Sequence, residues 1–517
     1  MGIEDRVVSW LAQQGAGIYL VGGCVRDWVL GRPIADLDVA TAEDGLILAR
    51  RLTNQLGGDF FALDEERSTG RALLHDEVRG RFVVDIARFQ GEDLAADLAR
   101  RDFTINALAV DARARQEVID PHGGMADLET GLIRPVSDSS IRDDPLRALR
   151  ALRQAAQLDF SLAPRTEALI RRDGAALAQV AGERVRDELA TLIALPRAAS
   201  YLVQLDELGV LTVILPELET LRGLDQAPPH YLDGLEHSLE TVRALEALLQ
   251  DLNGERDGER GSLEPDLPEA PDIALLLPFA DRVVAHLRGV MSDSRARLVT
   301  LKLSALLHDV GKPEAQAVDE DGRVRFIGHQ KGGAKSVGRA LRRLRFSNGE
   351  VRLGETIVTH HMRPLLLAGQ EGVTSRAVYR FFRDTGRAGV DVLVHALADH
   401  RATHAPGAED GRWLALVALT ARMLGDYWDR RPERVKPPPL VDGHDLAREF
   451  GLEPGPQIGE LLEAVREAQV AGEVGDRNEA LSLIGTRLGG EDGIRRRTPE
   501  SGVGRGVATN GADQAND

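Results

Sequence analysis

A glycine pair between a short apolar run and a helical segment constrains the fold of this chain more than any other feature. Residues 18–21 are apolar, Gly22 and Gly23 follow them, and residues 25–30 have helical spacing. We therefore predict a strand, a tight turn and the first turn of a helix. Glycine lets a backbone approach a ligand closely, and the free N–H groups at a helix start favour phosphate. The segment thus predicts a turn that binds phosphate.

A second strand is predicted directly after this turn, where Asp36 and Asp38 alternate with Leu37 and Val39. Side chains two apart on a strand share a face, so the two carboxylates project together while the apolar pair faces a core. Magnesium prefers one or two carboxylates combined with phosphate oxygens of a substrate. Two solvated aspartates in an exposed turn are the ordinary interpretation of such a pattern alone, but the preceding glycine turn favours a divalent-metal site.

Three segments in this order resemble a known family. They are GGCVRD from Gly22, LGRPIADLDVAT from Leu30 and RRDFTINALAVD from Arg100. Together they resemble the head of class II tRNA nucleotidyltransferases and bacterial poly(A) polymerases, which belong to the polymerase-beta nucleotidyltransferase superfamily. The resemblance extends over about residues 15–200. It implies nucleotidyl transfer that depends on Mg²⁺ held by Asp36 and Asp38.

The resemblance also implies which residues bind the nucleotide. Arginine is a forked phosphate donor, and asparagine can bond a sugar hydroxyl. Asp85 lies in a strand predicted over residues 82–87, where it is either a third active-site carboxylate or an edge-strand aspartate. The residues implied around the triphosphate and sugar are Gly22, Gly23, Arg26, Asp27, Arg101, Asp102 and Asn106.

A helix predicted from an Asp-Asp-Pro sequence carries the residues implied to choose the base. Asp144 and Arg147 are three apart, which in an isolated case indicates an ordinary ion pair. In the resembling family the matching residues act as a protein template for the incoming base. A carboxylate accepts from the exocyclic amino group that C and A share, and arginine donates to ring acceptors. The resemblance implies phosphate or sugar contacts for Arg150 and Arg153, and support of this helix by Arg184.

Histidines and aspartates in the second half of the chain follow the order H…HD…H…HH…D. This order resembles the HD-domain phosphohydrolases. Imidazole and carboxylate together can hold a transition metal and an activated water. The run of basic residues between Lys331 and Arg345 is compatible with either an RNA-facing or a solvated helix face. The predicted ligands of a divalent transition metal, whose identity the sequence leaves open, are His237, His308, Asp309, His329, His360, His361 and Asp399.

The resemblances and the composition divide the chain into domains. The 517 residues suggest about three domains. The predicted fold class is α+β: a polymerase-beta-like nucleotidyltransferase head with a small mixed sheet, an all-α neck and body, and an all-α HD domain. The expected boundaries are 1–140 for the head, 141–225 for the neck and RNA-binding body, 226–430 for the HD domain and 441–488 for a small helical region. Residues 251–272 and the tail, 489–517, are predicted to be disordered.

Composition limits the partners and the compartment. The net charge is −18, so an RNA site must be a local basic groove. No apolar run approaches the roughly 20 residues that span a membrane, and the N-terminus lacks the apolar core of a signal peptide. Cys24 is the only cysteine, which excludes an intrachain disulfide. We expect a cytoplasmic protein without a membrane partner, while the oligomeric state stays open.

The predicted function is template-independent addition of C and/or A to the 3′ end of tRNA, from CTP and ATP. CCA-adding relatives usually carry a longer flexible loop between the positions of Phe89 and Arg100, and the short segment here resembles enzymes that add CC only. The HD domain could hydrolyse a 2′,3′-cyclic phosphate or another phosphoester. The alternatives are a poly(A) polymerase, an HD phosphohydrolase with an inactive head, and a non-catalytic RNA-binding module.

Overall fold

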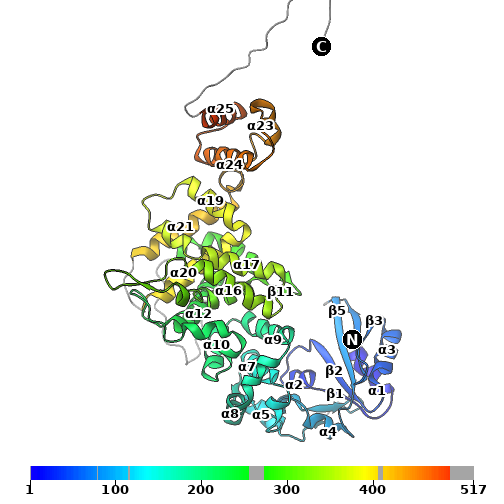
Figure 1. Cartoon of the computed structure of the whole chain (residues 1–517). Coiled ribbons are helices and arrows are strands. Elements are labelled where there is room, and N and C mark those ends of the chain that lie inside the picture. The colour runs from blue at the N-terminus through cyan, green and yellow to red at the C-terminus, as the bar shows by residue number, and fades with distance from the viewer. Residues whose placement is uncertain (1, 78–79, 115–116, 255–272, 406–410, 490–517) are drawn as a thin grey trace, which may run out of the picture. The chain divides into compact units, whose positions relative to one another are not determined.

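The computed structural model describes most of the chain, and the described residues form two compact units (Figure 1). The first unit comprises residues 1–372 and 384–425, and the second comprises residues 373–383 and everything from residue 426 onward. Within the described part, none of the helices combines the length and apolar character that a membrane crossing requires. The described residues are 2–77, 80–114, 117–254, 273–405 and 411–489.

The N-terminal part of the first unit is built on one seven-stranded sheet of order β3-β4-β5-β2-β1-β6-β7. β2 and β5 run parallel, and the other neighbouring pairs run antiparallel. The predicted head with a mixed sheet is therefore confirmed. The strands are β1 (Ile18–Val21), β2 (Asp36–Thr41), β3 (Gly58–Asp64), β4 (Thr69–Asp76), β5 (Gly80–Arg88), β6 (Ala109–Asp111) and β7 (Val118–Ile119).

The two faces of this sheet differ because side chains alternate along each strand. On one face Ala72, Leu74, Phe82, Val84 and Ile86 are buried, and α3 packs against the strands that carry them. The carboxylates of β2 lie on the opposite face. The helices of this part are α1 (Ile3–Gln13), α2 (Gly23–Val29), α3 (Gly45–Leu56), α4 (Leu94–Ala99) and α5 (Gly124–Thr130).

A helical neck follows, together with a small parallel pair of strands, β8 (Leu132–Ile133) and β9 (Ser161–Leu162). Asp144 lies just before the predicted helix rather than in it, because a residue that precedes proline is pushed into extended backbone. The helix itself starts after Pro145. The neck helices are α6 (Ser140–Asp143), α7 (Leu146–Leu158), α8 (Pro164–Asp173), α9 (Gly182–Ala194), α10 (Ala198–Glu207) and α11 (Leu211–Ile214).

The next part is almost entirely helical, as predicted for an HD domain. α14 is buried along nearly its whole length, which fits its continuous apolar sequence. Residues 251–253, the first of the segment predicted to be disordered, still belong to α12. Residues 255–272 lie outside the described residues. The helices are α12 (Gly234–Asn253), α13 (Ala280–Arg288), α14 (Arg297–Leu307), α15 (Lys312–Ala315), α16 (His329–Arg343), α17 (Asn348–His360), α18 (Arg363–Ala368), α20 (Gly389–Thr403) and α21 (Gly411–Trp428); the short hairpins are β10 (Val290–Ser292) with β11 (Arg295–Ala296) and β12 (Ala317–Val318) with β13 (Val324–Arg325).

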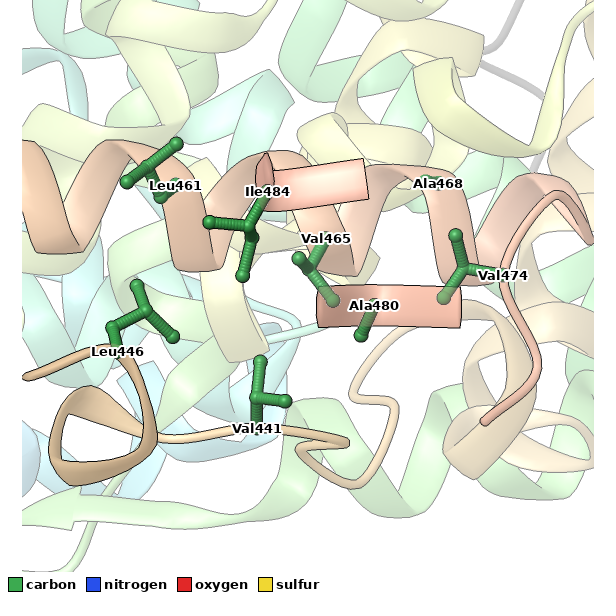
Figure 2. Packing of buried hydrophobic residues seen from close by; sticks show 8 residues of the cluster. All are labelled: Val441, Leu446, Leu461, Val465, Ala468, Val474, Ala480 and Ile484. Atoms are coloured by element: carbon green, nitrogen blue, oxygen red, sulfur yellow. The ribbon is translucent and has the colours of Figure 1, made fainter. Parts of the chain in front are cut away.

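The second unit is a small helical bundle with its own apolar core (Figure 2). Its α23 starts with a capping box in which Asp442 and Asp445 bond each other's backbone N–H. Asp445, which follows His444 in a second His-Asp sequence, therefore caps a helix. The predicted tail lies outside the described residues from residue 490 onward. The helices are α19 (Ser375–Thr385, shared with the first unit), α22 (Arg431–Arg434), α23 (Gly443–Phe450), α24 (Pro456–Ala471) and α25 (Arg477–Leu488).

A buried ion pair joins the HD helices to the neck. Lys302 of α14 donates to Glu246 of α12 at 2.6 Å and to the carbonyl of Leu195 at 2.7 Å. Glu246 also accepts from two backbone N–H groups at the start of α10. Burial lowers the pKa of Lys302 and raises the pKa of Glu246, so both charges depend on their mutual attraction.

We therefore expect Lys302→Met to lower the free energy of unfolding by roughly 3–5 kcal/mol, since it leaves a buried carboxylate without its cation. Urea unfolding of the full chain at pH 7 measures this loss. The double variant with Glu246→Gln should lose clearly less than the sum of the two single losses. Additive losses would show that the two side chains do not depend on each other.

Candidate functional site

Three carboxylates meet on the exposed face of the head sheet. Asp38 of β2 stands beside Asp85 of β5 in the parallel register, and Asp36 lies two residues earlier on the same face. Enclosure by the protein, and then repulsion by Asp36, raises the pKa of the half-buried Asp38 to about 6. Partial burial, followed by repulsion from Asp85, also raises the pKa of Asp36. Repelling carboxylates that are partly removed from water fit a site for a divalent cation.

Asp85 is not on an edge strand, because β5 lies between β4 and β2. Arg71 of β4 holds its carboxylate with two hydrogen bonds of 2.8 Å each. This forked contact fixes the direction of Asp85 beside Asp38. Sequence reasoning missed Arg71, because its position next to Asp85 depends on how β4 pairs with β5.

The predicted glycine turn lies directly against the carboxylates. Gly22 has a φ of +77°, and a Cβ atom there would lie 2.7 Å from Nη1 of Arg101 and 3.2 Å from Oδ2 of Asp38. Only glycine therefore allows this approach. Cys24 is buried behind the turn, and burial raises the pKa of its thiol to about 12, so it stays a neutral packing residue.

The residues implied around the nucleotide form one polar network. Arg26 donates to Asn106 at 2.9 Å and pairs with Asp27 at 2.9 Å. Asn106 in turn donates to Asp102 at 2.9 Å and to Gln154 at 3.0 Å. The structure thus brings these predicted residues together. Gln154 of α7, which the sequence did not single out, ties the network to the neck.

Asp144 and Arg147 are held by different neighbours. Asp144 pairs with Arg184 of α9 at 2.8 Å, while Arg147 donates to the carbonyl of Arg100 at 2.7 Å. The simple ion pair between Asp144 and Arg147 is not formed in the described structure, so neither side chain neutralises the other. α9 therefore supports the residues implied to read the base.

Arg150 and Arg153 of α7 share one acidic partner on α9. Glu188 of α9 accepts from Arg150 at 3.0 Å and from Arg153 at 2.5 Å. Arg150 also lies 3.4 Å from Asp102. Both arginines therefore join α7 to α9 and to the nucleotide network. Glu188 carried no sequence signal of its own, since its partners come from another helix.

A second cluster lies in the HD part, where helix ends converge. Two groups of side chains each bring their ligand atoms within 4.8 Å of one another. One distance in each group shows how tightly they meet: His237 Nε2 lies 3.0 Å from Asp399 Oδ1, and His329 Nε2 lies 3.2 Å from His361 Nε2. The first group is His237, His308 and Asp399, and the second is Asp309, His329 and His361.

Backbone carbonyls aim the imidazoles of this cluster inward. Nδ1 of His308, His329 and His361 lies 2.8, 2.8 and 2.7 Å from the carbonyl oxygens of Ala305, Phe326 and Val358. A carbonyl can only accept, so Nδ1 donates and Nε2 faces the centre of the cluster, where it can bind a metal once it has lost any proton. This is the arrangement that metal-binding histidines use.

The charge balance of the cluster also fits a metal. Burial works against protonation of His308, but Asp309 and Asp399 outweigh it and raise the pKa of His308 to about 10. Burial, and then the charge of His308, lowers the pKa of His361 to about 4. His308 Nε2 lies 3.1 Å from Asp309 Oδ2, and Lys312 Nζ lies 2.5 Å from the same oxygen. Without a metal these two cationic groups neutralise the carboxylate, and a divalent cation can take the place of the His308 proton.

Comparison with known proteins matches these two sites to family models. The Poly A polymerase head domain matches residues 18–134, and the HD domain matches residues 234–400. A tRNA nucleotidyltransferase domain 2 model matches residues 435–484 of the second unit. The A-adding tRNA nucleotidyltransferase of Deinococcus radiodurans is 36% identical, over 90% of this chain and 95% of that protein.

The chain belongs to the tRNA nucleotidyltransferase family. It is thus a nucleotidyltransferase enzyme, as predicted. The CC-adding tRNA nucleotidyltransferase of Thermus thermophilus is 33% identical, over 93% of this chain and 96% of that protein. A solved structure of a CCA-adding enzyme with CTP has a TM-score of 0.61 at 19% identity, over 95% of each chain. That likeness supports the fold of the nucleotidyltransferase.

Two histidines of this nucleotidyltransferase differ from the predicted ligand set. His360 is not brought into the cluster; its Nδ1 lies 3.4 Å from Arg363 Nη1 instead. His395, which sequence reasoning missed, is buried against the cluster, with its ring 5.0 Å from that of His308. Both of its nitrogens lack a partner among the described residues. The signal for His395 was its place one helical turn before Asp399.

Three of the six basic residues between Lys331 and Arg345 pair with acids. Arg342 pairs with Glu355 and Arg343 with Glu217, both at 2.8 Å. Arg345 lies 3.6 Å from Glu183 of the neck. These contacts join parts of the first unit, so they indicate a structural role for these three arginines.

Proposed function

We propose that the head of this nucleotidyltransferase transfers C and/or A from CTP and ATP to the 3′ end of tRNA. The observation that carries this proposal is the set of Asp36, Asp38 and Asp85 on one sheet face, against the turn at Gly22. The printed names of the relatives, A-adding and CC-adding tRNA nucleotidyltransferases, support the substrates.

The chain's own residues bind and orient the reactants. Asp36 and Asp38 would hold Mg²⁺, which when bound activates the attacking hydroxyl and offsets charge on the leaving pyrophosphate. Arg101, which touches the glycine turn, and Arg26 supply the cationic donors for a triphosphate. Asn106, held by Asp102, can bond the sugar. Arg71 fixes Asp85 beside the metal-binding pair.

Base choice rests on Asp144 and Arg147 in this proposal. Arg184 holds the carboxylate of Asp144, and the Arg100 carbonyl holds Arg147, so the two groups stand apart. Together they offer one acceptor and one donor. C and A present an amino donor and a ring acceptor that complement this pair, whereas G and U present a different pattern.

The segment between β5 and α4 supports a CC product. Gln90 donates its N–H to Asp97 at 2.9 Å, and Asp93 caps α4. The segment is therefore short and held at both ends. Because the resembling CCA-adding enzymes use a longer loop for the last adenosine, we propose that this enzyme stops after CC.

The test is extension of tRNA that lacks CCA, and of tRNA that ends in CC, with CTP and ATP together. We expect the first RNA to gain CC and the second to stay unchanged, as resolved on a sequencing gel. A complete CCA end contradicts the short-loop argument. Addition of A to the CC-ended RNA alone indicates an A-adding enzyme, and a long run of A indicates a poly(A) polymerase.

We also propose that the HD part is a metal-dependent phosphohydrolase acting on a 2′,3′-cyclic phosphate or another phosphoester. Its two ligand groups would hold divalent transition-metal ions, which when bound supply an activated water. Lys312, whose Nζ is bonded to Asp309 and Gln226, would contact a phosphate by exchanging one of these partners. We also propose a cytoplasmic location, which stays a prediction from the sequence.

A further inference from the structure

The sheet face that carries the catalytic carboxylates continues past them over β5, β4 and β3. In register with Asp38 stand Asp85, then Arg71, then Phe61, one residue on each successive strand. Neighbouring strands are about 4.8 Å apart, so this row extends roughly 14 Å from Asp38 to Phe61. It ends at the open edge of the sheet, since β3 is the terminal strand.

Phe61 points to the catalytic face rather than toward α3. Its neighbour Phe60 stacks under Arg50 of α3, at 4.7 Å from the ring centroid, so Phe60 faces the covered side. Alternation then places Phe61 on the opposite side. There it is 49% exposed, so part of the side chain is open to a partner.

The rest of this face combines apolar and basic side chains with one exposed acid, Asp59. Leu73 and Val83 form a half-buried apolar strip in the next row, beside Asp36. Beyond that strip lies the exposed Arg81, opposite His75. On the other side Arg71 is 41% exposed, although it holds Asp85. Two arginines therefore flank an apolar strip. The exposed Asp59 lies at its outer end, in register with Leu73, and Phe61 follows two residues later on the same face of β3.

We propose that this open face, defined by Phe61, Arg71, Leu73, Arg81 and Val83, binds the unpaired 3′ end of the RNA that the enzyme extends. This inference rests on the proposed function, because the 3′-hydroxyl must reach Asp36 and Asp38. Proteins hold single-stranded RNA by stacking its bases on aromatic rings and pairing its phosphates with arginine. Phe61 stacks a base, and Arg71 and Arg81 contact phosphates on either side of the strip.

The first test separates RNA binding from chemistry. Phe61→Ala and Arg81→Ala leave the carboxylates and Arg71 intact. We expect the KM for tRNA to rise roughly 10-fold or more in the double variant, with the KM for CTP and the kcat at saturating tRNA unchanged. The matched controls are Ile47→Ala and Arg51→Ala, which remove an exposed apolar and an exposed basic side chain from α3 on the other face.

The second test reads the contact without turnover. Phe61→Trp should lose fluorescence on addition of tRNA with its unpaired 3′ nucleotides, beyond the signal of the four native tryptophans. The same tRNA trimmed back to its paired acceptor stem should cause no such loss. Equal responses to both RNAs, or an unchanged KM for tRNA in the double variant, would overturn the inference. If the native enzyme extends no RNA, the proposed function fails instead, and the fluorescence experiment still decides the contact.

Discussion

Asp38→Asn is expected to abolish nucleotide transfer and, at the same time, to stabilise the metal-free protein at pH 8. Loss of one of two metal-holding carboxylates removes several kcal/mol of transition-state stabilisation, so the rate of tRNA extension should fall at least about 1000-fold. The gain in stability follows from the electrostatics of the metal-free site. Enclosure by the protein and the neighbouring Asp36 raise the pKa of Asp38 from 3.8 to about 6.

The sign of this effect depends on pH. Because the pKa is higher in the folded protein than in the unfolded chain, the charged form of Asp38 destabilises the fold above pH 6. Below pH 4 Asp38 is protonated in both states and contributes fully to the free energy of unfolding. This contribution is lost as the pH rises from 4 through 6. Asp38→Asn should therefore raise the free energy of unfolding by roughly 1–3 kcal/mol at pH 8 and by little at pH 4.

Urea unfolding in the presence of EDTA at pH 8, 6 and 4 measures this difference. Mg²⁺ should raise the melting temperature of the native protein and leave that of Asp38→Asn nearly unchanged. The matched control is Asp321→Asn, which alters an exposed aspartate outside the head sheet. An Asp38→Asn protein that is no more stable than the native one at pH 8, or that still extends tRNA at an ordinary rate, would contradict the account of this site.

The features that the sequence predicted correctly are local in the chain. The strand before Gly22, the turn itself and the alternation around Asp36 and Asp38 all depend on neighbours within a few residues. Arg71 and Glu188 were missed for the opposite reason. Each makes its contact with a strand or helix that is distant in the sequence, so no spacing along the chain indicates it.

Adjacent residues at a helix end illustrate a second limit. His360 and His361 follow each other, and successive side chains on a helix point about 100° apart, so only one of them can face a given centre. The sequence contains both, but the choice depends on how α17 is rotated against α14 and α20. The structure turns His361 inward. His395 was accessible from spacing, because it lies four residues before Asp399, on the same face of α20.

His308→Ala is expected to remove the bound transition metal and the phosphohydrolase activity while leaving nucleotide transfer intact. His308 contacts both carboxylates of the cluster, with its Nε2 3.1 Å from Asp309 and 3.5 Å from Asp399. It therefore stands between the two ligand groups. Elemental analysis of the dialysed protein should find metal in the native chain, at up to two ions for the two groups, and close to none in the variant. Hydrolysis of 2′,3′-cyclic AMP should fall about 100-fold or more.

The matched control for this variant is His360→Ala, which changes the adjacent ligand candidate that the structure leaves outside the cluster. It should keep its metal and its hydrolytic rate. Because Asp309 and Asp399 raise the pKa of His308 to about 10, a metal must displace a proton there, so metal affinity should increase from pH 6 to pH 9. Equal metal loss in both variants would contradict the inward orientation of His361, and a native chain without metal would remove the basis for a hydrolytic HD site. Unchanged tRNA extension in His308→Ala would show that the head works independently of the HD metal.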